Sequence, residues 1–257
     1  MYAKPLRRLS AVLAGLLAAT ALPAFAAEPL HIAVAANFTA PAKAIIAAYE
    51  KDTGRTVLPS FGSTGMLYAQ IRNGAPFGLF LAADSRRPQL LEEQGLAVRG
   101  SRRTYAVGRI VLWSPDSGLI KNGKATLRSG RFSRLAIAEP KAAPYGAAAK
   151  QVLEHLDLWK RLSPRIVRGQ NITQAYQYVA SGNAQLGFVA LSQIAMLPPE
   201  SKGSRWLVPQ SFYTPIQQQI VILKKAIDNP DAKAFYNYLK TPAAEKIIRQ
   251  YGYEIAK

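Results

Sequence analysis

Two patterns alternate along this chain, short apolar runs and longer segments with one apolar face. LHIAVA at 30–35 is an apolar run of strand length, and residues 41–52 carry apolar side chains at helical spacing before Gly54. Runs of this kind indicate a buried strand and an amphipathic helix that ends at a glycine. The alternation continues and predicts a parallel sheet with helices on both faces. The predicted strands are 30–35, 56–61 and 77–82, and the predicted helices are 41–52, 64–73 and 84–94.

The pattern begins again after Arg99 and predicts a second α/β unit. The predicted strands are 109–114, 135–138, 186–190, 206–208 and 217–223, and the predicted helices are 145–158, 172–181, 231–239 and 242–251. The strand at 217–223 could cross back to the first unit. Two units place a cleft between two lobes, and open α/β sheets bind ligands beyond the carboxyl ends of their strands. We assign residues 27–106 and 224–257 to the first lobe and residues 107–223 to the second.

The first 26 residues have the pattern of a secretory signal peptide. Three basic residues within positions 4–8 precede an apolar run at 9–22, and AFA at 24–26 is a cleavage signal of the A-x-A type. The apolar run is shorter than the roughly 20 residues that span a bilayer. We therefore expect a periplasmic protein, cleaved after Ala26, rather than one held by a membrane anchor.

Composition argues against several classes of function. The chain has no cysteine, which removes disulfides, thiolate metal sites and a lipidated cysteine. Its two histidines, His31 in a strand and His155 on a helix, belong to no catalytic motif, and no HExxH, GxSxG or P-loop pattern occurs. Asp84 beside Ser85 is explained by a helix cap. We expect a binding protein, with no enzymatic activity, no cofactor and no directly coordinated metal ion.

The formal net charge is +18, of which three charges lie in the signal peptide, leaving +15. Such an excess often marks proteins that bind nucleic acid or a membrane surface. Here the basic residues are dispersed, no stripe of them is interleaved with aromatic residues, and export argues against nucleic acid. A basic solvated surface explains them, and its positive field would speed the arrival of an anionic ligand.

Two uncharged turns, AANFT at 35–39 and FGSTG at 61–65, each join a predicted strand to a predicted helix. A helix N-terminus exposes about four unpaired N–H groups and roughly half a unit of positive charge. Two such ends aimed at one point would hold a small dianion. The side chains on offer are the amide of Asn37 and the hydroxyl of Ser63 or Thr64.

The second unit contains two similar helix starts, at Tyr145 and at Ile172. Ordinary helix capping explains any one of these starts. Four uncharged helix starts at strand ends, divided between two lobes, favour a site for an oxyanion instead.

Six segments of the mature chain carry a resemblance to a known family. They are VAANFTAPAKAIIAAYEKDTG, FGSTGMLYAQIRNGAP, LFLAAD, LAIAEPKAAPYGAAAKQVLEHLDLW, NITQAYQYVASGNAQLGFVALSQ and AFYNYLKTPAAEKIIRQYGY. In this order they resemble the periplasmic molybdate-binding proteins of ABC transporters, over essentially the whole mature chain. The resemblance implies a two-lobed type II periplasmic binding fold that closes around molybdate or tungstate and hands it to a membrane permease. It implies no stable oligomer.

The resemblance also implies ligand residues by position. These are Asn37, Ser63 or Thr64, Tyr145 and a backbone N–H at Ile172, with molybdenum held only as its oxyanion.

Two positions depart from the family pattern. Some members have a tyrosine just after the LG-x-V strand, where this chain has Ala190, and Tyr145 offers a phenol from another loop. Gly78 stands where the family often has aspartate, and we assign it no ligand role. Three alternatives remain: a receptor for sulfate or another small anion, an exported enzyme with Asp84 as its carboxylate, and an adhesin that uses the positive charge.

Overall fold

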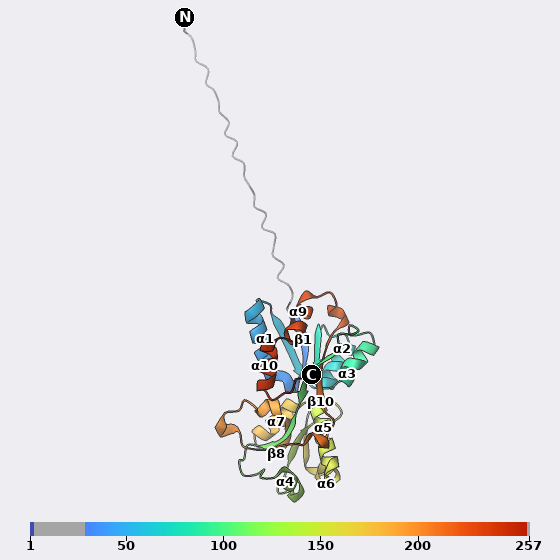
Figure 1. Ribbon diagram of the computed structural model, residues 1–257, viewed down its shortest axis with the longest axis vertical. Coiled ribbons are helices and arrows are strands. Elements are labelled where there is room, and N and C mark those ends of the chain that lie inside the picture. Colours follow the sequence, from blue (N-terminus) through green and yellow to red (C-terminus); the bar gives the residue numbers. More distant parts are fainter. Residues whose placement is uncertain (3–28, 256–257) are drawn as a thin grey trace.

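The computed structural model describes residues 1–2 and 29–255, and two lobes follow one another along its long axis (Figure 1). Each lobe is a five-stranded sheet with helices packed against it. The expected two-lobed α/β architecture is therefore confirmed. The predicted cleavage site after Ala26 lies outside the described residues. Within the described ranges, no helix has both the length and the apolar character that crossing a membrane requires.

The sheet of the first lobe has the strand order β2-β1-β3-β10-β4. Its strands are β1 (Leu30–Ala35), β2 (Val57–Gly62), β3 (Leu79–Ala82), β4 (Arg103–Gly108) and β10 (Ile216–Ile222). β1 runs parallel to β2 and β3, whereas β10 is antiparallel to β3 and β4. The helical segments are η1 (Ala36–Phe38), α1 (Thr39–Thr53), α2 (Thr64–Arg72), α3 (Arg86–Glu93), η5 (Lys224–Ala226), α9 (Pro230–Tyr238) and α10 (Pro242–Gln250).

The sheet of the second lobe repeats this arrangement in the order β7-β6-β8-β5-β9. Its strands are β5 (Ile110–Ser114), β6 (Leu135–Ala138), β7 (Ile166–Gly169), β8 (Leu186–Ala190) and β9 (Ser204–Leu207). β6 is parallel to β7 and β8, and β5 is antiparallel to β8 and β9. The helical segments are α4 (Gly123–Ser129), α5 (Pro144–His155), α6 (Trp159–Leu162), η2 (Ser163–Arg165), α7 (Ile172–Ala180), α8 (Leu191–Ile194), η3 (Pro199–Ser201) and η4 (Gln210–Phe212).

Local chemistry sets where the helices begin and end. α1 ends at Gly54, which takes a left-handed φ of 68° and donates its N–H to the Glu50 carbonyl (2.8 Å). α9 and α10 begin after Asn229 and Thr241, whose side chains accept first-turn N–H groups, and each has proline as its first helical residue. These signals are local, so the sequence predicts the helices well.

The structure corrects the predicted lobe boundary. β10 pairs with β3 and β4 in the first sheet, so the boundary that gave residues 107–223 to the second lobe is wrong for this strand. Ile220 and Val221 are fully buried opposite Leu81 and Phe80. A strand with apolar residues on both faces needs a central place in a covered sheet. The sequence analysis also missed β4, which pairs with β10 at the edge of that sheet.

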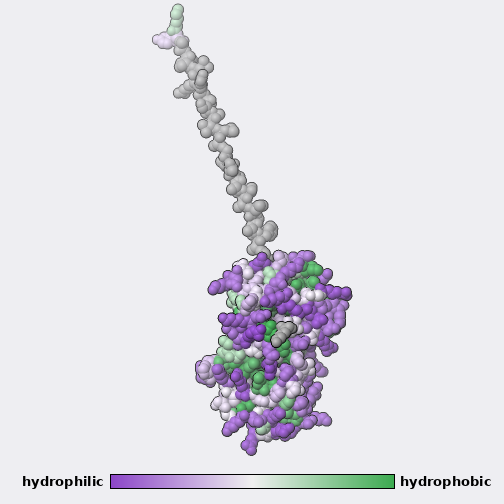
Figure 2. Space-filling model, viewed as in Figure 1, coloured by the Kyte–Doolittle hydropathy of each residue, from purple (hydrophilic) through white to green (hydrophobic). Residues whose placement is uncertain are grey.

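The chain crosses between the lobes at residues 108–110 and again at 208–215 (Figure 1), and Glu254 pairs with Val107 beside the first crossing. On the face shown in Figure 2, hydrophilic residues predominate and apolar residues gather around the waist between the lobes. Four strands, β1, β2, β6 and β7, each lead into a turn and then a helical segment. Their carboxyl ends position the turns described next.

Candidate functional site

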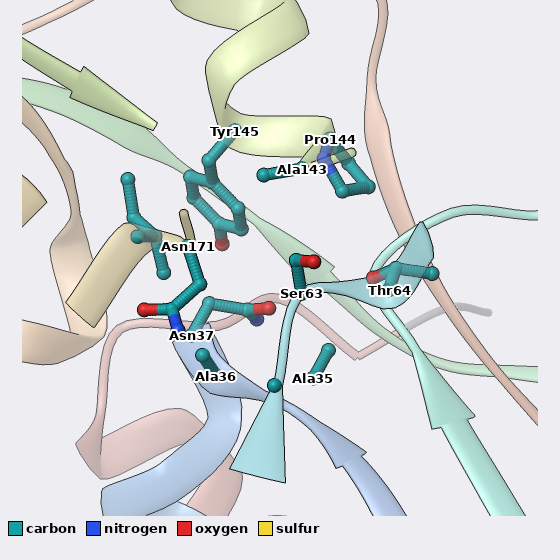
Figure 3. A pocket seen from close by; sticks show the side chains of 11 residues that line it. Ala35, Ala36, Asn37, Ser63, Thr64, Ala143, Pro144, Tyr145 and Asn171 are labelled. Carbon is teal, nitrogen blue, oxygen red and sulfur yellow. The ribbon is translucent and has the colours of Figure 1, made fainter. Parts of the chain in front are cut away.

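Four strand-to-helix turns, two from each lobe, meet at one small cavity (Figure 3). The structure brings all five predicted site residues to this cavity. Its lining consists of Ala35, Ala36, Asn37, Gly62, Ser63, Thr64, Ala143, Pro144, Tyr145, Asn171 and Ile172. The centre of a water molecule can move within about 10 Å³ of the cavity, close to the least space that one water needs, so the closed cavity excludes a sugar or a peptide.

The first turn, η1, is held by the side chain of Asn37. Its amide nitrogen donates to the Gln218 side-chain oxygen and to the Tyr253 hydroxyl, both at 2.9 Å, and the residue is 3% exposed. A carboxamide nitrogen has two hydrogens, so both donors of this side chain are used within the protein. The side chain of Asn37 therefore fixes the turn, and neither of its own donors is left for a ligand.

The second turn separates the roles of Ser63 and Thr64. Ser63 is the N-cap of α2, and its hydroxyl oxygen accepts the Met66 N–H at 3.4 Å, which leaves its own proton free to donate. The Thr64 hydroxyl oxygen accepts the Ala83 N–H at 3.1 Å and also keeps its proton. The longer hydrogen bond of Ser63 leaves its hydroxyl the less firmly held of the two, so we take Ser63 as the first candidate for a hydroxyl donor.

The third turn presents the phenol of Tyr145. Pro144 is the first residue of α5, and Tyr145 follows it with 1% exposure. Its hydroxyl is buried and has no hydrogen-bond partner among the described residues, and Figure 3 shows it directed toward the space between Ser63 and Asn37. Burial raises the pKa of this phenol well above its usual value, so it stays a neutral donor.

Gly108 makes room for this hydroxyl at the crossing between the lobes. A Cβ atom added to Gly108 would overlap the Tyr145 hydroxyl. A residue without a side chain is therefore required where β4 ends, because the phenol of the second lobe reaches the strand of the first at this point.

The fourth turn is capped by Asn171, whose side-chain oxygen accepts the N–H groups of Thr173 (2.9 Å) and Gln174 (3.0 Å). These bonds satisfy two of the first-turn donors of α7. The N–H of Ile172, the first helical residue, has no acceptor among the described residues. Ile172 therefore brings a main-chain donor to the cavity, as the sequence predicted, while Asn171 is a lining residue that the site prediction omitted.

The electrostatics of the cavity come from main-chain and hydroxyl groups alone. No charged residue contributes to its lining, and no group of three or more histidine or acidic side chains in the described residues could hold a metal ion. The N–H groups of Thr64, Tyr145 and Ile172 lie in the first turns of three helices, where no helical carbonyl is available to them. Such ends favour an anion.

Sequence reasoning missed the two residues that hold Asn37. Gln218 is fully buried, but it is the second of three consecutive glutamines in β10, and nothing in the sequence distinguishes it from the other two. Tyr253 lies near the end of the chain, and nothing in its local sequence distinguishes it from a surface tyrosine.

The two departures from the family pattern have simple structural accounts. Ala190 ends β8, does not line the cavity, and donates its N–H to the Gln193 side chain (2.9 Å). Gly78 donates its N–H to the His31 carbonyl (2.7 Å), and an added Cβ would lie 2.7 Å from a methyl carbon of Leu30. A side chain at residue 78 would therefore require its neighbours to move.

The carboxylate of Asp84 serves the local structure. It accepts the Arg87 N–H at 2.9 Å and pairs with the Arg87 guanidinium. The guanidinium also donates to the Lys141 carbonyl of the second lobe at 3.0 Å. Asp84 thus accepts a first-turn N–H of α3 from the position before its N-cap, Ser85, and positions Arg87 for an interlobe contact.

The lobes touch each other on both sides of the cavity. The Gly65 N–H donates to the Ala142 carbonyl at 2.9 Å, and the Thr173 hydroxyl donates to the Ala36 carbonyl at 3.4 Å. Each bond joins a turn of one lobe to a turn of the other. Two lobes closed over an uncharged cavity of donors define a protein that encloses a small solute.

Comparison with known proteins identifies the family of this chain. The model of the family described as bacterial extracellular solute-binding protein matches residues 30–254. The molybdate-binding protein ModA of Azotobacter vinelandii is 52% identical over 93% of this chain and 94% of its own, and that of Rhodobacter capsulatus is 48% identical over 96% of each. The solved periplasmic molybdate-binding protein of Azotobacter vinelandii has a TM-score of 0.86 and 42% identity, covering 89% of this chain and 100% of its own.

The chain belongs to the bacterial extracellular solute-binding proteins. The predicted two-lobed periplasmic binding fold is confirmed by the similarity to the solved structure. The expectation of a binding protein rather than an enzyme is confirmed by the family.

Proposed function

We propose that this protein captures molybdate, and tungstate with it, and delivers the oxyanion to the membrane permease of an ABC transporter. The observation that carries the proposal is the buried Tyr145 hydroxyl, which has no hydrogen-bond partner within 3.5 Å among the described residues, in a cavity that none of the described charged residues lines. Two relatives named molybdate-binding proteins, 52% and 48% identical over nearly the whole chain, support the choice of ion.

The proposed ligands are two hydroxyls and a set of main-chain N–H groups. The hydroxyls belong to Ser63 and Tyr145, and the N–H groups belong to Asn37, Thr64, Tyr145 and Ile172. Hydrogen bonds to ionised groups contribute about 1.5–3 kcal/mol each. Several neutral donors therefore hold a dianion firmly without a fixed counter-charge, and the ion can leave when the lobes open.

Cavity size is the proposed basis of selectivity. Molybdate, tungstate and sulfate are all tetrahedral dianions, so the same donors serve each of them. A receptor for sulfate or another small oxyanion is therefore the alternative to be tested first.

Titration calorimetry of one protein sample with molybdate, tungstate and sulfate tests the proposal. We expect strong binding of the first two ions and weak or no binding of sulfate. A heat signal from sulfate alone would overturn the assignment of the ligand.

A matched pair of variants tests which hydroxyl binds. Ser63→Ala removes a free donor and should lower molybdate affinity about tenfold, the effect of one hydrogen bond to a charged group. Thr64→Val removes the acceptor of the Ala83 N–H, so it should lower the free energy of unfolding and leave affinity nearly unchanged. The reverse result in calorimetry and thermal melting would assign the ligand hydroxyl to Thr64.

We further propose that residues 1–26 direct export and that the mature periplasmic chain begins at Ala27, works as a monomer and binds no nucleic acid. N-terminal sequencing of the protein from the periplasm tests the cleavage site, and light scattering tests the oligomeric state.

A further inference from the structure

A cluster of hydrogen bonds lies behind the cavity and outside its lining. The Asn37 carbonyl accepts the hydroxyls of Ser192 (2.7 Å) and Tyr253 (2.8 Å), and these two hydroxyl oxygens are 3.1 Å apart. The Asn37 side-chain nitrogen also donates to the Tyr253 hydroxyl at 2.9 Å. Tyr253 therefore holds Asn37 at two points, its main chain and its side chain.

The three residues come from both lobes. Ser192 lies on α8, directly after β8 of the second sheet, whereas Asn37 follows β1 of the first. Tyr253 belongs to the first lobe, because its ring packs edge-on against Phe38 with centroids 5.3 Å apart. The hydrogen bond from the Ser192 hydroxyl to the Asn37 carbonyl thus joins the lobes.

The three residues that form these hydrogen bonds are buried. Asn37, Ser192 and Tyr253 are 3%, 4% and 4% exposed, and the two bonds to the carbonyl have the lengths of well-formed O–H···O hydrogen bonds. Buried polar groups that lose a partner are costly to leave unpaired. Separating the lobes would take Ser192 from a carbonyl on the turn that carries a proposed ligand N–H.

A hydrogen bond between the lobes changes how readily they open, and this one does not contact the ligand. Neither Ser192 nor Tyr253 lines the cavity. Any interaction present only in the closed form raises the population of that form, with or without a ligand. A ligand enclosed between lobes leaves when they open, so the same interaction slows its release.

We propose that Ser192 is a positioning residue whose hydroxyl latches the closed form onto the Asn37 turn, a turn that Tyr253 holds within the first lobe. The latch sets the closed fraction of the free protein and the rate at which a bound oxyanion is released. Its kinetic consequence rests on the proposed binding of molybdate, whereas its effect on the closed fraction does not.

Stopped-flow kinetics with molybdate test the release rate on the full chain. Ser192→Ala removes the interlobe hydrogen bond and should raise the dissociation rate constant about fivefold, with the association rate constant changed less than twofold.

Two control variants remove comparable hydrogen bonds that stay within one lobe. The Ser114 hydroxyl donates to the Gln185 carbonyl at 2.6 Å, and the Tyr236 hydroxyl donates to the Ser101 carbonyl at 2.8 Å. Ser114→Ala and Tyr236→Phe should lower the thermal midpoint without changing the dissociation rate constant. Equal rate changes in the controls and in Ser192→Ala would overturn the proposal.

Spin-label distances measure the closed fraction without any ligand. The chain has no cysteine, so labels can be attached through Lys51→Cys in the first lobe and Lys160→Cys in the second, both exposed positions. We expect Ser192→Ala to shift the distance distribution of the free protein away from its closed component. An unchanged distribution would overturn the latch. If the unmodified protein ignored molybdate, the proposed function would fail, while this measurement would still decide the latch.

Discussion

Asn37 in the first lobe and Tyr145 in the second both present a polar side chain to the same cavity, but the two serve opposite purposes. Both side-chain donors of Asn37 are used by Gln218 and Tyr253. The Tyr145 hydroxyl has no partner among the described residues. A polar side chain at a binding turn can therefore either hold the shape of the turn or contact the solute, and its own hydrogen bonds distinguish the two roles.

Asn37→Ala should have the largest effect. It removes both side-chain anchors of the first turn and leaves the buried Gln218 oxygen without its donor, whereas the Tyr253 hydroxyl keeps the main-chain carbonyl of residue 37. An unpaired buried polar group costs about 1–3 kcal/mol, so we expect the free energy of unfolding to fall by about 2 kcal/mol. Molybdate affinity should fall about a hundredfold, because the turn that aims the main-chain N–H is no longer held.

Chemical denaturation and calorimetry measure these two losses. Asn183→Ala, at an exposed position of the second lobe, is the control and should change neither quantity. A loss of affinity with unchanged stability would mean that the Asn37 side chain contacts the ion directly, and the contrast with Tyr145 would disappear.

Tyr145→Phe should lower affinity about tenfold, the effect of one lost hydrogen bond to a charged group. The free energy of unfolding should stay the same or rise, because the lost hydroxyl is buried without a partner. Calorimetry and denaturant unfolding are the measurements, and their opposite trends separate this variant from Asn37→Ala.

Tyr49 provides a matched control for this variant. Its hydroxyl is also buried without a partner, in the core of the first lobe away from the cavity. Tyr49→Phe should therefore keep stability and leave affinity unchanged. If Tyr145→Phe destabilised the protein while Tyr49→Phe did not, the Tyr145 hydroxyl would have a structural role instead.

Local pattern explains why much of the fold is predictable from the sequence. β6 and β8 have the predicted bounds, 135–138 and 186–190, because short apolar runs define buried strands. The sheet to which β10 belongs was not predictable in the same way. Its partners β3 and β4 lie more than a hundred residues earlier, and strand pairing over such a separation leaves no trace in the local sequence.

The candidate site, like the fold, was predictable from the sequence only where its features are local. Helix starts are local features, so the sequence could point to Asn37, Ser63 and Tyr145 as polar residues at strand ends. The partners of Asn37 lie 181 and 216 residues away, at Gln218 and Tyr253. Which side chain is free and which is engaged depends on these distant contacts, so the role of each residue required the structure.

Asn171→Ala removes the side chain that caps the fourth turn, in the second lobe. Its effect on affinity should be smaller than that of Tyr145→Phe. The variant leaves the N–H groups of Thr173 and Gln174 without their cap, which costs about 1 kcal/mol in an N-cap position. Affinity should fall only a few-fold, because the Ile172 N–H belongs to the first turn that frays. Asn229→Ala removes an equivalent cap from α9, far from the cavity, and should lower stability equally without changing affinity. An equal loss of affinity in both variants would mean that general destabilisation, and not the turn, is responsible.

The smallest expected effect is that of pH between 7 and 9. Tyr145 is the one titratable side chain among the lining residues, and burial raises its pKa well above the usual value of 10. A raised pKa keeps the phenol protonated as pH increases, so its donor stays available and affinity should change less than twofold over this range. Loss of the proton at higher pH would place a negative charge beside the dianion, so affinity can only fall there. Tyr253 behind the cavity also stays protonated over this range, because burial raises its pKa to about 12.

Calorimetry at pH 7, 8 and 9 with the same molybdate stock measures how affinity changes with pH, and Tyr145→Phe gives the reference without the phenol. A steep fall in the unmodified protein that Tyr145→Phe abolished would show that the phenol ionises in this range, and it would no longer be the neutral donor that distinguishes the second lobe from the first.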